Sequence, residues 1–291
     1  MRGRFEKMEN PMAVPRICHV VVDVGDRLEE AARRYRALGF NLTPRPRSHS
    51  LGSANHFAMF TPEYIELLSP GSGTRPDLAG YPVGLNGLVF AMEGAEALHE
   101  DLLARGLPVQ PVQRFSRAVD LPDGETGEAQ IHVVRLEPRT VFDGRTYFCE
   151  HLSPELIWRP EWQAHPNGAL GLERIALSAR DPNAVVNVFD RIFGAGAVAR
   201  TTGQEGPHVL RAGKVAVEVW PQDELSRTLA GAMPDPEGRA DHLVLLGIRV
   251  HSLRKTEELL RANGTQIAAV GANRILVRPT EAMNVAMEFV A

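Results

Sequence analysis

The stretches ICHVVVDV at residues 17–24 and YIELLSP at residues 64–70 begin and end a unit that the chain repeats. Three further apolar strands match the second stretch, each with one internal glutamate: YFCEHLSP at 147–154, VAVEVWP at 215–221 and VAMEFVA at 285–291. A carboxylate buried without a partner costs on the order of several kcal/mol or takes up a proton. Four such placements indicate one inherited position with a role.

Each unit reads as a strand, a helix that stops at a glycine, and a hairpin that ends in the glutamate strand. The units cover residues 17–70, 85–155, 170–221 and 241–291. Serial repetition of one pattern predicts a repeated architecture. When the stop glycines Gly39, Gly106, Gly194 and Gly264 are aligned, His19 on the first opening strand corresponds to Asn86, Arg174 and Val244.

Residues 154–169, PELIWRPEWQAHPNGA, have the proline, glycine and polar content of a connector. We therefore expect a loose tail over residues 1–16, an N-terminal domain over 17–160 and a C-terminal domain over 161–291. Trp158 and Trp162 in the connector are expected to pack the two domains together. An irregular stretch that carries Arg114 and Arg117 is expected before the second hairpin.

Composition excludes several classes of function. The chain has 291 residues, 44% hydrophobic and 23% charged, as in ordinary globular proteins. A formal net charge of −4 gives no electrostatic reason to bind nucleic acid or an anionic membrane. We expect no apolar run of the length that a membrane-spanning helix needs and no signal peptide, so the cytoplasm is the expected location. Two cysteines do not make a disulfide framework.

The segments CHVVVDVGD (18–26), RYRALGF (34–40), LGSANHFAMF (51–60) and YIELLSP (64–70) resemble glyoxalase-like domains of the vicinal oxygen chelate superfamily, the glyoxalase, bleomycin-resistance and extradiol-dioxygenase group. The resemblance implies an α+β fold of tandem paired βαβββ modules, in which four modules make two half-open barrels. It also implies a divalent metal held by the first and last strands of each module. Those positions would be His19 and Glu66 in the first module, and Asn86 and Glu150 in the second.

The residue types suit that role in part. An imidazole and carboxylates bind Zn²⁺, Fe²⁺, Mn²⁺ or Ni²⁺, so His19, Glu66 and Glu150 would make a three-ligand set with open positions. Asn86 would be a poor fourth ligand and is instead a substrate-binding candidate. Glu150 is preferred to His151 because superposing Ser69-Pro70 on Ser153-Pro154 aligns it with Glu66, although a bulge would reverse the choice.

Other side chains are candidates for the same pocket. Asn55 and His56 could orient a substrate carbonyl, and His132 stands at a similar place in the second module. Arg114 and Arg117 could clamp a carboxylate. In the absence of metal, Glu66 would pair with an arginine, for which Arg45, Arg114 and Arg135 are available.

The third and fourth modules have different residues at the metal positions. In the third, Arg174 could form a salt bridge with Glu218 in place of a metal site. In the fourth, His242 could form a metal site with Glu288. Strand alternation turns Cys18 and Cys149 away from the neighbouring candidate ligands, so they are expected to pack as small apolar residues.

The favoured hypothesis is a metalloenzyme that performs isomerase or lyase chemistry on a small oxygenated substrate through an enediolate, with Glu150 and His56 as catalytic candidates. Two alternatives stay open. An extradiol-type dioxygenase would need His151 to turn inward as a second histidine ligand. A non-enzymatic binding protein would lack the metal and pair its glutamates with arginines. A homodimer is compatible with each of them.

Overall fold

The fold is known from a computed structural model that describes residues 14–44, 52–71, 80–120, 126–201, 205–229 and 231–291. The α-helices in this part of the chain are α1 (Leu28–Ala37), α2 (Ala95–Ala104), α3 (Pro160–Gln163), α4 (Pro182–Phe193), α5 (Gln222–Leu229) and α6 (Leu253–Ala262). Two short 3₁₀ helices cover Pro154–Leu156 and Pro279–Ala282.

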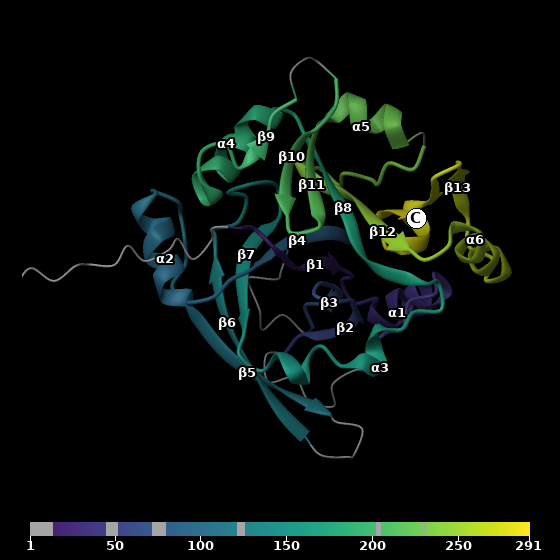
Figure 1. The fold of residues 1–291 in the computed structure, drawn as a ribbon, viewed down its shortest axis with the longest axis horizontal. Coiled ribbons are helices and arrows are strands. Elements are labelled where there is room, and N and C mark those ends of the chain that lie inside the picture. Colours follow the sequence, from purple (N-terminus) through teal and green to yellow (C-terminus); the bar gives the residue numbers. More distant parts are fainter. Residues whose placement is uncertain (1–13, 45–51, 72–79, 121–125, 202–204, 230) are drawn as a thin grey trace, which may run out of the picture.

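The strands form two sheets (Figure 1). The first has the order β2-β3-β1-β4-β7-β6-β5, and its strands are β1 (Ile17–Asp23), β2 (Ala54–Met59), β3 (Tyr64–Ser69), β4 (Gly84–Ala91), β5 (Gln113–Asp120), β6 (Thr126–Arg135) and β7 (Arg145–His151). The second has the order β13-β14-β15-β12-β8-β11-β10-β9, and its strands are β8 (Ala169–Ala179), β9 (Val198–Ala199), β10 (His208–Ala212), β11 (Val215–Pro221), β12 (His242–Val250), β13 (Ile267–Val270), β14 (Arg274–Val277) and β15 (Ala286–Val290).

The sheet order confirms the α+β fold of paired βαβββ modules. In every module the opening strand lies parallel to the last strand, which carries the glutamate. The pairs are β1 with β3, β4 with β7, β8 with β11, and β12 with β15. The opening strands of paired modules lie antiparallel, β1 beside β4 and β8 beside β12. First and last strands are therefore neighbours, which lets their side chains share one face of a half-barrel.

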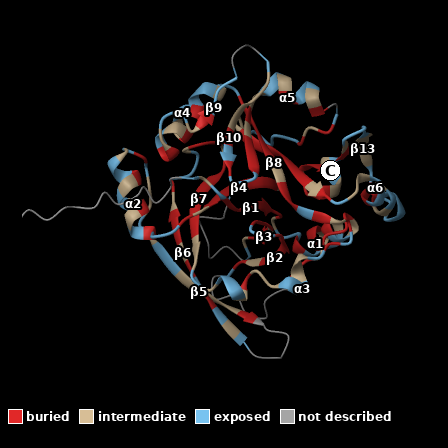
Figure 2. Ribbon diagram, viewed as in Figure 1, coloured by how far each residue is buried: buried red, intermediate tan, exposed pale blue. Residues whose placement is uncertain are grey.

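The largest cluster of buried hydrophobic residues has members from both halves of the chain, and Figure 2 shows the buried strands at the centre of the molecule. Phe40, after α1, stacks on Phe289 of β15 with ring centroids 6.2 Å apart. Phe90 of β4 meets Phe193 of α4 edge to face at 4.8 Å. The two sheets are thus joined through buried aromatic contacts as well as through the connector.

Three expectations about local structure are corrected. The stretch with Arg114 and Arg117 is strand β5, which pairs with β6 as a long hairpin. The tryptophans of the connector do not join the two halves, since Trp158 and Trp162 pack on the cluster inside the N-terminal sheet. The sequence analysis made no prediction for the segment after the third module, which forms helix α5. Residues 1–13 of the expected tail, and Arg45, lie outside the described residues.

None of the helices that the structure describes is long and apolar enough to cross a membrane.

Candidate functional site

A cavity of about 90 Å³ lies inside the N-terminal half-barrel. Its polar and ionisable lining is unusually dense for an interior: Ser53, Asn55, Tyr64, Glu66, Arg117, Arg135, Tyr147, Cys149, His19 and His151. Phe57, Leu68, Phe115, Ile131 and Val133 complete the wall. Concave sites that combine apolar walls with a few convergent polar groups are where small molecules bind.

His19 on β1 sits at the centre of this lining. Its ring stacks on Tyr64, with centroids 4.4 Å apart, and its Nε2 lies 3.1 Å from the hydroxyl of Tyr147 and 3.6 Å from Oε2 of Glu66. Burial, with nearby His151 and Arg135, lowers the pKa of His19 well below its usual value. The imidazole is therefore neutral at pH 7, and its Nε2 can accept a hydrogen bond from the hydroxyl of Tyr147.

Glu66 on β3 is the carboxylate of the cavity. Asn55 on β2 donates to its Oε1 from Nδ2 at 2.8 Å, which fixes the carboxylate's orientation. Burial raises the pKa of Glu66, and the Asn55 hydrogen bond only partly opposes that shift. A buried carboxylate with a raised pKa is a stronger base than an exposed one and is suited to general-base work.

Two arginines bring positive charge to the same cavity. The guanidinium of Arg117 lies over the Phe57 ring at 4.5 Å, and that of Arg135 over the Tyr147 ring at 4.4 Å. Burial lowers the pKa of Arg117, yet a guanidinium stays protonated at any physiological pH. Within the described part of the chain, Nε of Arg117 has no hydrogen-bond partner, so this donor is available to a ligand.

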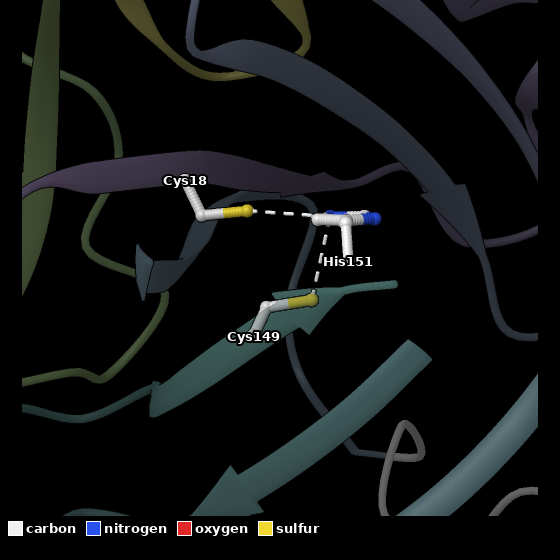
Figure 3. Close-up of side chains that lie close together, drawn as sticks. All are labelled: Cys18, Cys149 and His151. Atoms are coloured by element: carbon white, nitrogen blue, oxygen red, sulfur yellow. Dashed lines mark hydrogen bonds between the residues drawn. The ribbon is translucent and has the colours of Figure 1, made fainter. Parts of the chain in front are cut away.

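The two cysteines face the interior, contrary to expectation. In the β1–β4 ladder Ile17 pairs with Phe90 and His19 with Val89, so Cys18 is an extra bulged residue and points to the same side as His19. Nε2 of His151 lies 3.4 Å from each sulfur, as Figure 3 shows. A hydrogen bond from the Cys18 thiol, with His151 nearby, lowers the pKa of Cys149 to about 5.

Glu150 does not join His19 and Glu66. On β7, alternation places Tyr147, Cys149 and His151 on the cavity face, and Glu150 on the other. The Glu150 carboxylate accepts from the backbone N–H of Gly94 at 2.8 Å and lies 3.2 Å from Nδ1 of His132. His132, which was also a candidate for the pocket, therefore contacts Glu150 and does not line the cavity.

The other sequence candidates divide between the cavity and its surroundings. Asn55 lines the cavity, whereas neighbouring His56 is turned away, with Nδ1 2.7 Å from the carbonyl of Thr43. Asn86 lies at the boundary of the two halves, where it donates to Pro82 and accepts from Arg239. Exposed Arg114 pairs with Glu96 outside the cavity. Of the two arginines predicted to clamp a carboxylate, Arg117 lines the cavity together with Arg135, and Arg114 does not.

Strand registers give the equivalent positions of the two modules. His19 pairs with Tyr64, two residues before Glu66, and Val89 pairs with Tyr147, two residues before Cys149. Val89 and Cys149 therefore stand where the sequence alignment put Asn86 and Glu150. Tyr64 and Tyr147 were not among the predicted site residues. Aligning these two tyrosines in the sequence would have given the correct register of the second module.

The C-terminal half-barrel holds a salt bridge at the corresponding place. Arg174 donates to Glu218 from Nη1 at 2.9 Å and to Glu288 from Nε at 2.8 Å, which confirms the predicted pairing of Arg174 with Glu218. In the fourth module Leu245, rather than Val244, is the equivalent of His19. Glu288 is already bound by Arg174 and Arg274, so His242 does not form a site with it.

Residues 17–193 match the family model described as glyoxalase-like domain. The chain belongs to this family. A search of proteins with curated functions found no match. Solved structures with the same fold include a hypothetical protein from Staphylococcus aureus (9% identity, 95% of this chain and 99% of that one, TM-score 0.65). They also include a variant of 4-hydroxymandelate synthase from Streptomyces coelicolor (9% identity, 96% and 93%, TM-score 0.61).

A fusion protein of a xylose isomerase-like TIM barrel and 4-hydroxyphenylpyruvate dioxygenase is a further match (11% identity, 99% of this chain and 51% of that one, TM-score 0.60). Identities this low show the fold alone. The family match confirms the resemblance to glyoxalase-like domains.

Family membership suggests a divalent metal, and the donor set tests that suggestion. The four equivalent positions hold His19, Glu66, Val89 and Cys149, and a valine cannot bind metal. His151 turns inward, as a two-histidine dioxygenase site would require, but its Nε2 faces two sulfurs. Among the described residues, no third histidine, cysteine, aspartate or glutamate donor converges with His19 and Glu66. The residues present do not fit the expected site.

Proposed function

We propose that this protein is an enzyme that binds a small anionic, oxygenated substrate in the N-terminal cavity and moves a proton next to a carbonyl, in isomerase or lyase chemistry through an enediolate. The observation that carries the proposal is the position of one buried carboxylate, Glu66, in the same cavity as two guanidinium groups and a tyrosine hydroxyl.

Glu66 would act as the general base. Asn55 orients its carboxylate, and burial raises its pKa toward the range in which a carboxylate both accepts and returns a proton. Neutral His19, 3.6 Å away, would help to hold the carboxyl group in place by a hydrogen bond once Glu66 carries the proton. His56 and Glu150, proposed from sequence for this work, lie elsewhere.

Arg117, Arg135 and Tyr147 would bind the negative charge. Guanidinium and hydroxyl donors that are already held in place stabilise an oxyanion without reorganising during the reaction. The stacking of Arg117 on Phe57 and of Arg135 on Tyr147 holds the two guanidinium groups. These donors would supply the stabilisation that a metal supplies in the original hypothesis.

The test is proton exchange on a probe substrate. Purified protein is incubated with hydroxypyruvate in D₂O, because loss of its C3 proton gives an enediolate, and loss of the C3 proton signal is followed by NMR, next to a panel of 2-oxo and 2-hydroxy carboxylates. We expect the wild type to accelerate exchange, and Glu66→Gln to lower the rate by about 100-fold or more with little change in Kd. Arg117→Gln should raise the Kd by about 10-fold.

Glu128→Gln is the matched control, because this carboxylate stands on β6 of the same sheet, is exposed and bonds to Ser116. It should change neither rate nor Kd. Saturable binding without exchange would refute the catalytic part and leave a binding protein. Absence of binding across the panel would refute the proposal as a whole.

A further inference from the structure

Three donor atoms converge at one end of the cavity without taking part in the chemistry above. They are Sγ of Cys18 on β1, Sγ of Cys149 on β7 and Nε2 of His151 (Figure 3). All lie within 4.8 Å of one another, and within the described ranges this is the only set of three histidine, cysteine or carboxylate donors that does so. The side chains come from two strands that β4 separates in the sheet, so sequence proximity does not explain the convergence.

We propose that Cys18, Cys149 and His151 form a three-ligand site for a thiophilic divalent cation, with Zn²⁺ as the ion that this donor set fits. Sulfur and imidazole ligands favour zinc over Mg²⁺, Ca²⁺ or Mn²⁺. Three protein ligands leave a fourth position of a tetrahedral site free.

The spacing of the donors supports the assignment. Zn–S and Zn–N bonds of about 2.3 and 2.05 Å at tetrahedral angles place a sulfur and a nitrogen ligand about 3.6 Å apart. Nε2 of His151 lies 3.4 Å from each of the two sulfurs. These two sulfur–nitrogen distances therefore need to change by only a few tenths of an ångström when the ion binds.

The surroundings also suit a metal site. His19 Nδ1 lies 3.2 Å from Sγ of Cys18 and can support this ligand by a hydrogen bond. Trp158 packs edge to face on the His151 ring at 4.8 Å and holds its orientation. An ion can arrive through a second, larger cavity of about 630 Å³, which is lined by all three proposed ligands.

This site differs from the one expected for the family, which would use His19 and Glu66. Cys149 and His151 also line the cavity that contains Glu66. A bound zinc would thus lie at the edge of the substrate cavity. Its binding does not depend on the proton-transfer proposal, since it requires neither Glu66 nor a substrate.

The experiment is metal binding by reduced, tag-free protein with Co²⁺ as a spectroscopic probe and Zn²⁺ as competitor. We expect about one equivalent of Co²⁺ per chain with a thiolate-to-cobalt charge-transfer band, and loss of that band when Zn²⁺ is added. Cys149→Ser, Cys18→Ser and His151→Gln should each raise the Kd by about 100-fold or more, because even loss of a supporting group costs 10- to 100-fold. Glu66→Gln should bind as the wild type does.

Each alternative outcome overturns the proposal. Wild-type protein that binds Co²⁺ without a thiolate band, or does not bind it while both thiols titrate as reduced, refutes the site without any variant. Binding that Glu66→Gln abolishes and the cysteine variants keep would assign the metal to the family position instead. Circular dichroism of each variant separates loss of metal from loss of fold.

Discussion

Replacing Arg174 by methionine tests how the C-terminal half-barrel is stabilised. This guanidinium bridges Glu218 and Glu288, and Glu288 is only 2% exposed. Removing one partner of a buried ion pair costs about 3–5 kcal/mol, because the remaining charge stays desolvated. Arg274 still contacts Glu288, and Trp220 still donates to Glu218, so we expect the low end, about 3 kcal/mol.

That loss converts into a melting temperature. With an unfolding entropy of about 2.1 cal/mol/K per residue, a chain of 291 residues that unfolds as one unit should lose about 5 °C. If the C-terminal half of about 130 residues unfolds alone, the same loss should be about 11 °C. Calorimetry of Arg174→Met therefore also reports whether the two halves unfold together.

The double variant Arg174→Met, Glu288→Gln provides the control. The neutral amide no longer leaves a desolvated charge, so the double variant should be more stable than Arg174→Met alone, by about 1–2 kcal/mol. A cost below about 1 kcal/mol for Arg174→Met, or strictly additive costs, would show that solvent screens this network and that the reasoning is wrong.

Three shorter predictions concern other sites. Burial, with Arg239 nearby, lowers the pKa of His242 to about 4, so between about pH 6.5 and 4 only the unfolded chain binds a proton at this histidine. The free energy of unfolding should therefore fall by up to about 3 kcal/mol as the pH falls through that range. In denaturant melts, His242→Leu should lose less stability over the same range than the wild type does. Gly87→Ala places a Cβ 2.6 Å from that of Val21 in the β1–β4 pair, which should cost about 1–3 kcal/mol in a thermal melt, and unchanged stability would contradict it. Glu150→Gln weakens the bonds to Gly94 and His132, with an expected loss of about 1 kcal/mol that a melt at pH 7 would detect or refute.

The repeated architecture could be predicted because it depends on patterns that lie within one segment. Apolar strands with a single glutamate, and helices stopped by glycine, report local structure directly. The parallel pairing of first and last strands then followed from the resemblance, and the salt bridge of Arg174 with Glu218 from the register of the third module.

The second module shows why the site itself was harder to predict. Ser69 still belongs to β3, whereas β7 ends at His151, before Ser153, so the two Ser-Pro pairs are not structurally equivalent. A shift of one residue turns a strand's side chains to the opposite face, which exchanges Glu150 for Cys149. The bulge at Cys18 has no signature in the local sequence, because it arises from pairing with β4, a segment far along the chain.

The contact of Phe40 with Phe289 has a consequence for synthesis. Phe289 is translated after β8 to β14, so Phe40 lacks this one aromatic partner while those strands are being made. At about 5–20 residues per second, the roughly 140 residues after the N-terminal sheet take roughly 7–28 s to appear. The nascent N-terminal half therefore exposes the part of its apolar surface that packs against Phe289 until β15 has been synthesised.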